Sequence, residues 1–497
     1  MVSAMISVEP ITIPEGYKQT EVGVIPEGWL VKTFKEICTV NQGLQIAIDR
    51  RKKFPTSQSR VYITIQYINS SNEPEYIDDY SSSVCCDPDD VLMTRTGNTG
   101  IVVTGVTGVF HNNFFKIDFD RNNINSKYFV YYLRSHDCQK TILDKAGIST
   151  IPDLNHGDFY SILMPIPAIK EQTAIANALS DVDNLIASLE TLIAKKSAIK
   201  TAAMQQLLTG KKRLPAFVKE SEKQGAKQSS ELDNTSETAQ AAQTKQASTL
   251  NSDLYKESGE GLDLKSNQHS EVSNANNKQT APRPGYKQTE LGEIPEDWEV
   301  KPLGELLSFK NGLNKAKEYF GYGLPIVNYM DVYSNPGIAS ANIKGMVDVT
   351  KEEVAAYSVK KGDVFFTRTS ETVNEIGLST VLLDDIDSGV FSGFVLRGRE
   401  KSDQLNLMFK KYCFSSYYIR KQIGSTSSYT TRALTNGSLL SNVELIFPSC
   451  KKEQAAIANF LSDMDTELDA LQQRLSKTQK IKQGMMQELL TGNTRLV

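Results

Sequence analysis

The sequence EQTAIANALSDVDNLIASLETLIAKKSAIKTAAMQQLLTGKKRL, residues 171–214, decides the fold of this chain. It recurs without a gap at residues 453–496, as EQAAIANFLSDMDTELDALQQRLSKTQKIKQGMMQELLTGNTRL, with 22 of 44 positions identical. Apolar residues recur at steps of three and four in both copies, which predicts a long helix with a narrow apolar seam. The predicted seam residues are Ile175, Leu179, Val182, Ile186 and Leu189, extending to Ile199, in the first copy and Ile457, Leu461, Met464, Leu468 and Leu471, extending to Ile481, in the second.

A helix of about 40 residues spans roughly 60 Å at 1.5 Å per residue. A narrow apolar stripe on a lone helix of this length needs a partner, and the other copy is the simplest one. We therefore expect the two helices to form an antiparallel coiled coil. Each copy ends in Leu-Leu-Thr-Gly, so Gly210 and Gly492 are expected to be C-cap residues.

Composition limits the class of protein. The chain has 497 residues, enough for two or three domains, and a net charge of −4, which excludes a uniformly basic nucleic-acid coat. DNA binding would therefore depend on local patches or on partner subunits. There is no apolar run long enough to cross a bilayer and no signal-peptide pattern. The six scattered cysteines and four histidines lack metal-ligand spacing, so we expect a cytoplasmic protein with reduced thiols and no bound metal.

A second repeat opens each half of the chain, as GYKQTEVGVIPEGW at residues 16–29 and GYKQTELGEIPEDW at residues 285–298. Trp29 and Trp298 are the only tryptophans, and we expect both to anchor a core. Mixed segments follow, with a predicted strand at residues 61–67, a strand pair at 101–109 and helices at 127–134 and 407–420. Residues 215–284 are polar and poor in aromatic side chains, which indicates a flexible linker.

The predicted fold is α+β, with two similar globular modules separated by two long helices and related by a pseudo-twofold. The expected order is an N-terminal extension (1–15), the first module (16–166), the first helix (167–214), the linker (215–284), the second module (285–447) and the second helix (448–497). The modules share strand and turn landmarks, but the segments that lie between these landmarks differ from one module to the other. Such a shared frame with unlike loops is expected of two modules with different specificities.

Catalytic motifs are absent from the sequence. It contains no phosphate-binding G-x-x-x-x-G-K-[ST], no Pro-Pro dipeptide of amino-methyltransferases, no G-x-S-x-G and no H-E-x-x-H. Glu299-Val300-Lys301 matches the E-x-K of nucleases, but the first module has Leu30-Val31-Lys32 at that place. Gly97-Asn98-Thr99-Gly100 fits either a phosphate-binding nest of N–H groups or a tight turn between strands.

The remaining polar clusters are typical of DNA recognition. Arginine suits guanine and Asn or Gln suits adenine, and loops are where binding residues concentrate. A single such loop is typical of a solvated turn, but similar Thr-Arg-Thr segments end a predicted strand in both halves, so DNA contact and a solvated turn both remain open. The candidate DNA-binding residues are Arg50, Arg51, Lys52, Arg95, Thr96, Asn98, Thr99, Thr150 and Asn155 in the first half, and Lys315, Lys317, Arg368, Thr369, Ser370, Tyr429, Arg432 and Asn436 in the second.

These motifs, in this order and repeated twice, resemble the specificity subunits of type I restriction-modification systems. The resemblance rests on the openings at residues 17–29 and 286–298, the Gly-Asp-Val-Phe-Phe-Thr-Arg strand at Gly362, the stretch at residues 149–155, the Pro-x-x-x-x-Glu-Gln helix starts and the Leu-Leu-Thr-Gly ends. The second half departs at residues 430–436, where the proline is missing. The resemblance implies that each module is a target recognition domain that reads one half of a bipartite DNA site.

The resemblance further implies that the helices set the spacing and dock two modification subunits. S-adenosylmethionine would then belong to the modification subunits, ATP and Mg to the restriction/translocase subunits, and this chain would bind no cofactor and catalyse no reaction. Two alternatives remain open from the sequence. One is a stand-alone DNA methyltransferase or nuclease with a degenerate site, and the other is a coiled-coil scaffold without DNA readout.

Overall fold

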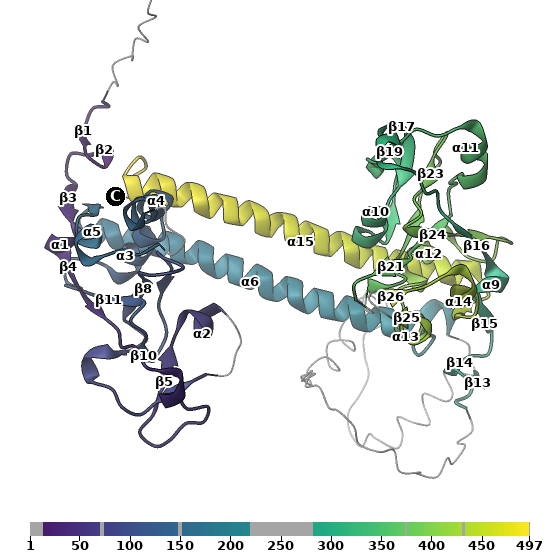
Figure 1. Ribbon diagram of the computed structural model, residues 1–497, viewed down its shortest axis with the longest axis horizontal. Helices are drawn as coiled ribbons and strands as arrows, with labels where there is room; N and C mark the ends of the chain where they lie inside the picture. The colour runs from purple at the N-terminus through teal and green to yellow at the C-terminus, as the bar shows by residue number, and fades with distance from the viewer. Residues whose placement is uncertain are drawn as a thin grey trace, which may run out of the picture. The chain divides into compact units, whose positions relative to one another are not determined.

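The computed structural model describes residues 13–69, 74–147, 152–218, 282–372, 375–429 and 433–496. The chain divides into two compact units (Figure 1). The first unit comprises residues 1–191 and 473–497, and the second comprises residues 192–472. Each unit therefore combines one globular module with parts of both long helices. None of the helices in the described ranges is long and apolar enough to span a membrane.

The first unit is built around two small four-stranded sheets. The first sheet has the order β4 (Cys38–Gln42), β11 (Phe114–Phe119), β8 (Val91–Thr94) and β9 (Val102–Val103), and the second has the order β6 (Tyr76–Ile77), β5 (Arg60–Ile63), β10 (Gly108–Phe110) and β7 (Cys85–Cys86). Two strand pairs complete it: β1 (Tyr17–Thr20) with β2 (Gly23–Pro26), and β3 (Leu30–Thr33) with β12 (Leu163–Ile166). Its short helices are α1 (Phe34–Ile37), η1 (Ile48–Arg50), α2 (Ile65–Asn69), η2 (Ser82–Val84), α3 (Ser126–Leu133), α4 (His136–Ala146) and α5 (His156–Tyr160).

The second unit repeats this frame with a larger sheet. That sheet has the order β16 (Leu307–Asn311), β24 (Val395–Glu400), β20 (Val364–Thr367), β22 (Ser379–Leu382) and β18 (Gly337–Ile338). Around it lie β19 (Met346–Val347), β17 (Phe320–Val327) and β23 (Val390–Phe391); β21 (Thr369–Ser370), β26 (Ala433–Leu434) and β25 (Ser428–Tyr429); and the pairs β13 (Tyr286–Thr289) with β14 (Gly292–Pro295) and β15 (Trp298–Pro302) with β27 (Glu444–Pro448). Its short helices are η3 (Pro215–Phe217), α9 (Leu303–Leu306), η4 (Lys317–Tyr319), α10 (Tyr329–Ser334), η5 (Ser340–Asn342), α11 (Lys351–Tyr357), α12 (Leu407–Cys413), α13 (Tyr417–Thr426) and α14 (Gly437–Ser441).

The two predicted long helices are α6 (Ile169–Leu207) and α15 (Lys451–Thr491). Within each unit they run antiparallel, because contacts advance along α6 as they retreat along α15. In the first unit Glu171 bonds Arg495 and Asp183 pairs with Lys482 at 2.6 Å. In the second unit Lys196 pairs with Glu467 at 2.8 Å and Arg213, beyond the end of α6, bonds Glu453. The predicted fold class is confirmed.

The apolar seam is buried most deeply where the helices meet a module. Ile175 and Leu179 pack in the core of the first unit together with Leu489 and Leu490. Ile457, Leu461 and Met464 pack in the core of the second unit together with Ile199. The predicted seam residues Val182, Ile186, Leu468 and Leu471 are only half-buried, and Leu189 is buried. The expectation for Ile481 was wrong, because its side chain is exposed whereas that of its counterpart Ile199 is buried.

Three repeated motifs of the sequence converge on one helix-end node in each unit. In the first unit the Trp29 indole donates to Glu171 at 3.1 Å, and Arg495 bonds the same carboxylate at 2.9 and 3.0 Å. In the second unit Trp298 donates to Glu453 at 3.3 Å, and Arg213 bonds that carboxylate at 2.7 and 2.9 Å. Each node therefore joins a module opening, the start of one long helix and the segment that follows the other.

Gly210 and Gly492 complete the nodes. Both have positive φ, +70° and +77°, as expected of glycines that end a helix. Gly492 directly follows α15, which confirms that prediction, whereas α6 ends at Leu207 and Gly210 lies three residues beyond it. A Cβ atom at Gly210 would collide with Pro295, and one at Gly492 would collide with Pro26. Glycine is therefore required at both positions for two reasons: the backbone has a positive φ, and the module opening approaches too closely for a Cβ atom. Trp29 and Trp298 are both buried, as predicted.

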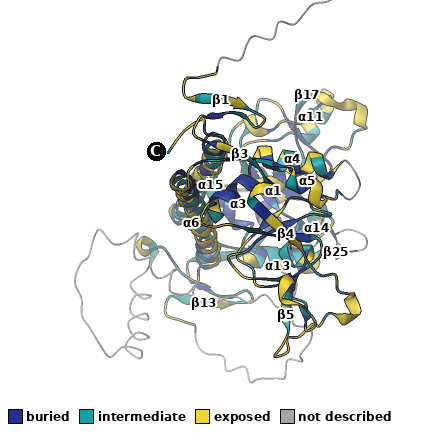
Figure 2. Ribbon diagram, turned by 90° about the vertical axis from the view of Figure 1, so that its left-hand side faces the viewer, coloured by how far each residue is buried: buried dark blue, intermediate teal, exposed yellow. Residues whose placement is uncertain are grey.

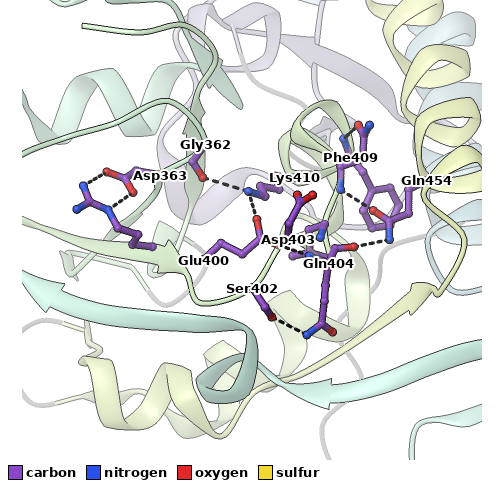
Figure 3. A network of polar contacts seen from close by, with 12 residues as sticks. Gly362, Asp363, Glu400, Ser402, Asp403, Gln404, Phe409, Lys410 and Gln454 are labelled. Carbon is purple, nitrogen blue, oxygen red and sulfur yellow. Dashed lines mark hydrogen bonds and ion pairs between the residues drawn. The ribbon is translucent and has the colours of Figure 1, made fainter. Parts of the chain in front are cut away.

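A glutamine at the start of each long helix fastens it to the module (Figure 3). The Gln454 amide accepts from Asn406 N at 2.6 Å and donates to the carbonyls of Gln404 and Pro448 at 3.0 and 2.8 Å. Gln172 makes the same three bonds in the first unit, with Asn125 N and the carbonyls of Asn123 and Pro167. In the second unit, the buried Lys410 ammonium, which pairs with Glu400, extends this polar network.

Three local predictions need correction. The predicted strand at residues 61–67 ends at Ile63, and the chain turns into α2. The predicted helix at 407–420 is split into α12 and α13, because Ser416 begins a new helix. The strands at 101–109 do not pair with each other: β9 pairs with β8, and β10 pairs with β5 and β7. Alternation and helical period identify apolar faces, but they do not give partners in a sheet.

Candidate nucleic-acid interface

Three segments meet beside the end of strand β8 in the first unit. The strand-end residue Arg95 donates its N–H to Asn113 O at 2.7 Å and accepts at its carbonyl from Leu154 N at 2.8 Å. The loop after β4 joins them, because the Asn112 amide donates to Gln45 at 3.1 Å. We call this surface the first recognition edge, comprising residues 45–54, 95–99, 111–113 and 152–155.

The second unit builds the same surface from corresponding residues. Arg368 donates its N–H to Phe394 O at 3.2 Å and accepts from Thr435 N at 3.0 Å. The loop after β16 joins them through Gly393 N, which donates to Leu313 O at 2.8 Å. The second recognition edge comprises residues 314–322, 368–372, 392–394 and 433–436. The structure thus brings together, in each unit, the two loop segments that the sequence singled out separately.

The side chain of Arg95 is held inside the first edge. Its guanidinium donates to both carboxylate oxygens of Asp153 at 3.0 Å and lies 5.3 Å from the centre of the Phe115 ring. Only 14% of the side chain is exposed. Thr96 also donates to Asp153, so this carboxylate compensates the positive charge at the strand end. The prediction that Arg95 and Thr96 contact DNA is untested, but Arg95 is engaged within the chain.

The glycine loop that follows is a tight turn. Gly97 N donates to Pro152 O at 3.1 Å, and Gly100 N donates to Thr94 O at 2.8 Å. The Thr99 hydroxyl donates to the carbonyls of Pro152 and Arg95 at 2.8 and 3.0 Å. These N–H groups are used internally, so the geometry favours the turn over the phosphate nest. Asn98 is exposed at its tip.

Arg368 has a different environment from Arg95. Its guanidinium donates only a long bond, 3.5 Å, to Gly393 O, and no carboxylate among the described residues pairs with it. The position that corresponds to Asp153 is Leu434, which is partly exposed. Thr369 and Ser370 form β21, and Ser370 donates to Glu375 at 2.8 Å. Hydrogen bonds from Ser370, Tyr333 and Thr372 hold the pKa of Glu375 below its usual value.

The basic residues of the first loop divide into two kinds. Arg51 is tied to Glu75 at 3.0 Å and to Ile46 O, and Lys52 pairs with Asp78. Arg50 is exposed, as is Lys53 next to Lys52. In the second unit Lys315 pairs with Glu353 at 2.8 Å, which raises the pKa of Lys315. Lys317 is exposed.

Two predicted asparagines have a local structural role. Asn155 accepts from Asp158 N at 2.9 Å as the N-cap of α5, and Asn436 accepts from Leu439 N at 3.0 Å as the N-cap of α14. Thr150 and Arg432 lie outside the described residues, and Tyr429 is described only as part of β25. Their predicted contacts with DNA remain predictions. No cluster of metal-ligating side chains occurs within the described ranges.

A family model described as a type I restriction modification DNA specificity domain matches residues 26–197 and 295–483. The two matches cover well over half of the chain, one in each half. The chain belongs to the family of type I restriction-modification DNA specificity proteins. Its two matched segments are DNA specificity domains, and it is the sequence-specificity subunit of such a system.

Two relatives of this family come from Methanocaldococcus jannaschii. The type I restriction enzyme MjaVIII specificity subunit is 21% identical, with 97% of this chain and 96% of that protein covered. The putative type I restriction enzyme MjaX specificity subunit is 26% identical over 41% of this chain and 48% of its own length. The crystal structure of the S subunit from M. genitalium covers 93% of this chain and 96% of its own at 14% identity, with a TM-score of 0.46.

The sequence did not identify the helix-end nodes. Glu171, Glu453, Arg213 and Arg495 had no assigned role, although all lie within repeated motifs. Their signal in the sequence was that Glu171 matches Glu453 and Arg213 matches Arg495 in the two copies of the long repeat. The sequence also did not identify Asp153 as the partner of Arg95, because that pairing depends on a contact between segments 58 positions apart.

Proposed function

We propose that this chain is the non-catalytic DNA-reading subunit of a methyltransferase and endonuclease complex, with each unit reading one half of a bipartite target. The observation that carries this proposal is the pair of recognition edges. They share backbone contacts around Arg95 and Arg368 but differ in the side chains they present, such as Asp153 and Leu434. A shared frame with unlike contacts suits two different short half-sites.

The helices and nodes would hold the modules and dock the modification subunits. S-adenosylmethionine would be bound by two modification subunits, and ATP and Mg by restriction/translocase subunits, with no cofactor on this chain. Paired, ordered helices with exposed faces support this division, as does the absence of a catalytic motif from the sequence. The partners would also supply the positive charge that a chain of net charge −4 does not offer to DNA.

A methylation map tests the proposal. The chain is co-expressed with its modification subunit, and modified bases are located by sequencing the host DNA. Two short half-sites around a fixed unspecified spacer are expected. Methylation at one continuous site would contradict two-module reading. Methyl transfer from S-adenosylmethionine by the purified chain alone would support the stand-alone enzyme instead, and a stable complex that methylates nothing would support a scaffold.

A further inference from the structure

The loop that starts each recognition edge exposes large apolar side chains. In the first unit Ile48 and Phe54 are 77% and 80% exposed. In the second unit the corresponding segment exposes Tyr319, Phe320 and Tyr322, the last at 54%. Figure 2 shows exposed residues at the end of β17 and in the segments near β5. Single exposed apolar side chains are normal on a protein surface, but exposed apolar side chains that gather on one loop mark an interaction surface, and here they gather on corresponding loops of both units.

The first loop is held in place by polar contacts. Arg51 bonds Ile46 O at 3.0 and 3.1 Å and pairs with Glu75. Lys52 and Tyr76 exchange backbone hydrogen bonds of 2.8 Å, directly before the segment that carries Phe54. The two residues tied down therefore anchor the loop, while the exposed Arg50 and Lys53 accompany the exposed apolar side chains.

The second loop displays its tyrosine through a β-bulge. Phe320 and Leu324 both align with Val347 of β19, so the residues between them are left out of the ladder. Gly321 and Gly323 have φ values of +101° and +95°, and a Cβ atom at Gly323 would collide with the Val347 carbonyl. Two glycines thus place Tyr322 outside the sheet by a specific backbone path. The exposed Lys317 lies on the same loop.

Apolar or aromatic groups accompanied by cations match the chemistry of a DNA base step, because the rings stack on bases while the cations contact phosphates. We infer that these loops are wedges, in which Phe54 and Tyr322 each stack against or insert between bases of the half-site that their unit reads. The inference rests on the proposed function and extends it. Side chains that open a base step unstack the duplex, and methylation of a base requires that it leave the stack.

The test uses the complex of the full chain with its modification subunit and duplexes that carry the mapped target. Phe54→Ala and Tyr322→Ala are expected to lower the methylation rate about five-fold or more at subsaturating DNA, the fold-change that corresponds to the stacking of one base on an aromatic ring. Phe54→Trp and Tyr322→Trp should retain most of the rate. Leu143→Ala and Tyr417→Ala remove exposed apolar side chains away from the edges and should leave it unchanged.

A mismatch walk separates a wedge from an ordinary contact. A single mismatch is placed at each step of one half-site and its flank, and the rate is measured with every variant. A mismatch in the first half-site should restore the methylation rate of the Phe54→Ala complex, because the duplex is already opened there. For the same reason, a mismatch in the second half-site should restore the rate of the Tyr322→Ala complex. Loss of rate without rescue at any step would overturn the wedge, as would wild-type rates for both alanine variants. If the wild-type complex has no bipartite target, the proposed function itself fails.

Discussion

The two units compensate charge at different places. In the first unit the strand-end Arg95 is neutralised by Asp153. In the second unit Arg368 takes the place of Arg95, and Leu434 takes the place of Asp153. At the helix-end nodes both units have an Arg–Glu pair, but there the pair of the second unit is the more deeply buried one. Arg213 and Glu453 are 3% and 1% exposed, but Arg495 is 41% exposed against a buried Glu171. One backbone frame therefore tolerates an arginine with or without a carboxylate partner among the described residues at the recognition edges. At the helix-end nodes the arginine is paired with a glutamate in both units.

The largest expected effect is at the buried node. Arg213→Met leaves the Glu453 carboxylate buried without its cation, which should destabilise the second unit by about 3–5 kcal/mol. Arg495→Met should cost clearly less, because Arg495 itself is 41% exposed and its removal opens the Glu171 carboxylate to water. Denaturant unfolding of the full chain, monitored separately by Trp298 and Trp29 fluorescence in single-tryptophan variants, measures both. Lys480→Met, an exposed position on α15, is the control. Equal losses at the two nodes would contradict the comparison.

The next effect concerns DNA. Arg368→Ala should reduce discrimination at the second half-site by about 1–3 kcal/mol, the range for a bidentate base contact. Arg95→Ala should reduce it less at the first half-site, because Asp153 already holds that guanidinium. Methylation rates on duplexes with single base changes measure both.

The same comparison can be reversed by substitution. Leu434→Asp copies the first unit into the second, and it should weaken DNA reading there toward the effect of Arg368→Ala. Leu434→Asn has a similar size without the charge and is the matched control. If Leu434→Asp and Leu434→Asn behave alike, charge compensation does not distinguish the edges.

Polar substitutions in the helix seam should have an intermediate effect on stability and assembly. Ile186→Asn and Leu468→Asn place an amide at corresponding, half-buried seam positions. Each should cost about 1–3 kcal/mol, by loss of apolar burial and incomplete hydrogen bonding, and weaken assembly with the modification subunit. Sedimentation of the mixed subunits tests assembly. Ile481→Asn, at an exposed position on α15, is the control. If the Ile186→Asn, Leu468→Asn double variant assembles as well as wild type, the prediction that the apolar seam is needed for assembly is wrong.

The smallest effect is a pH dependence in the second unit. Burial raises the pKa of Asp465, but hydrogen bonds from Lys200 and Tyr412 outweigh it, and the pKa lies below its usual value. The stabilisation is therefore present above the unfolded-state pKa of about 3.9 and is lost as pH falls through the lower folded-state value. Unfolding free energies between about pH 5 and 3 should fall less in Asp465→Asn than in wild type. Parallel curves would contradict this.

The fold could be predicted from the sequence where the same physical constraint recurs in both halves of the chain. The seam of Ile175 and Ile457, the C-cap glycine Gly492 and the buried tryptophans all followed from repeated patterns. Exposure of Ile481 could not be predicted, because it depends on where the module ends along the helix. The pairing of Arg95 with Asp153 joins distant segments, and only the folded backbone brings them together. Composition alone likewise gave no sign that Arg51 and Lys52 are tied down by Glu75 and Asp78.

The central claim is that each unit reads its own half of one target. The most direct measurement is a methylation map of host DNA from three strains, which express the modification subunit with the wild-type chain, with Arg95→Ala or with Arg368→Ala. The account predicts a bipartite motif in wild type, relaxation of one half only in Arg368→Ala, and a weaker relaxation confined to the other half in Arg95→Ala. Relaxation of the same half by both variants, or of both halves by either one, would contradict it.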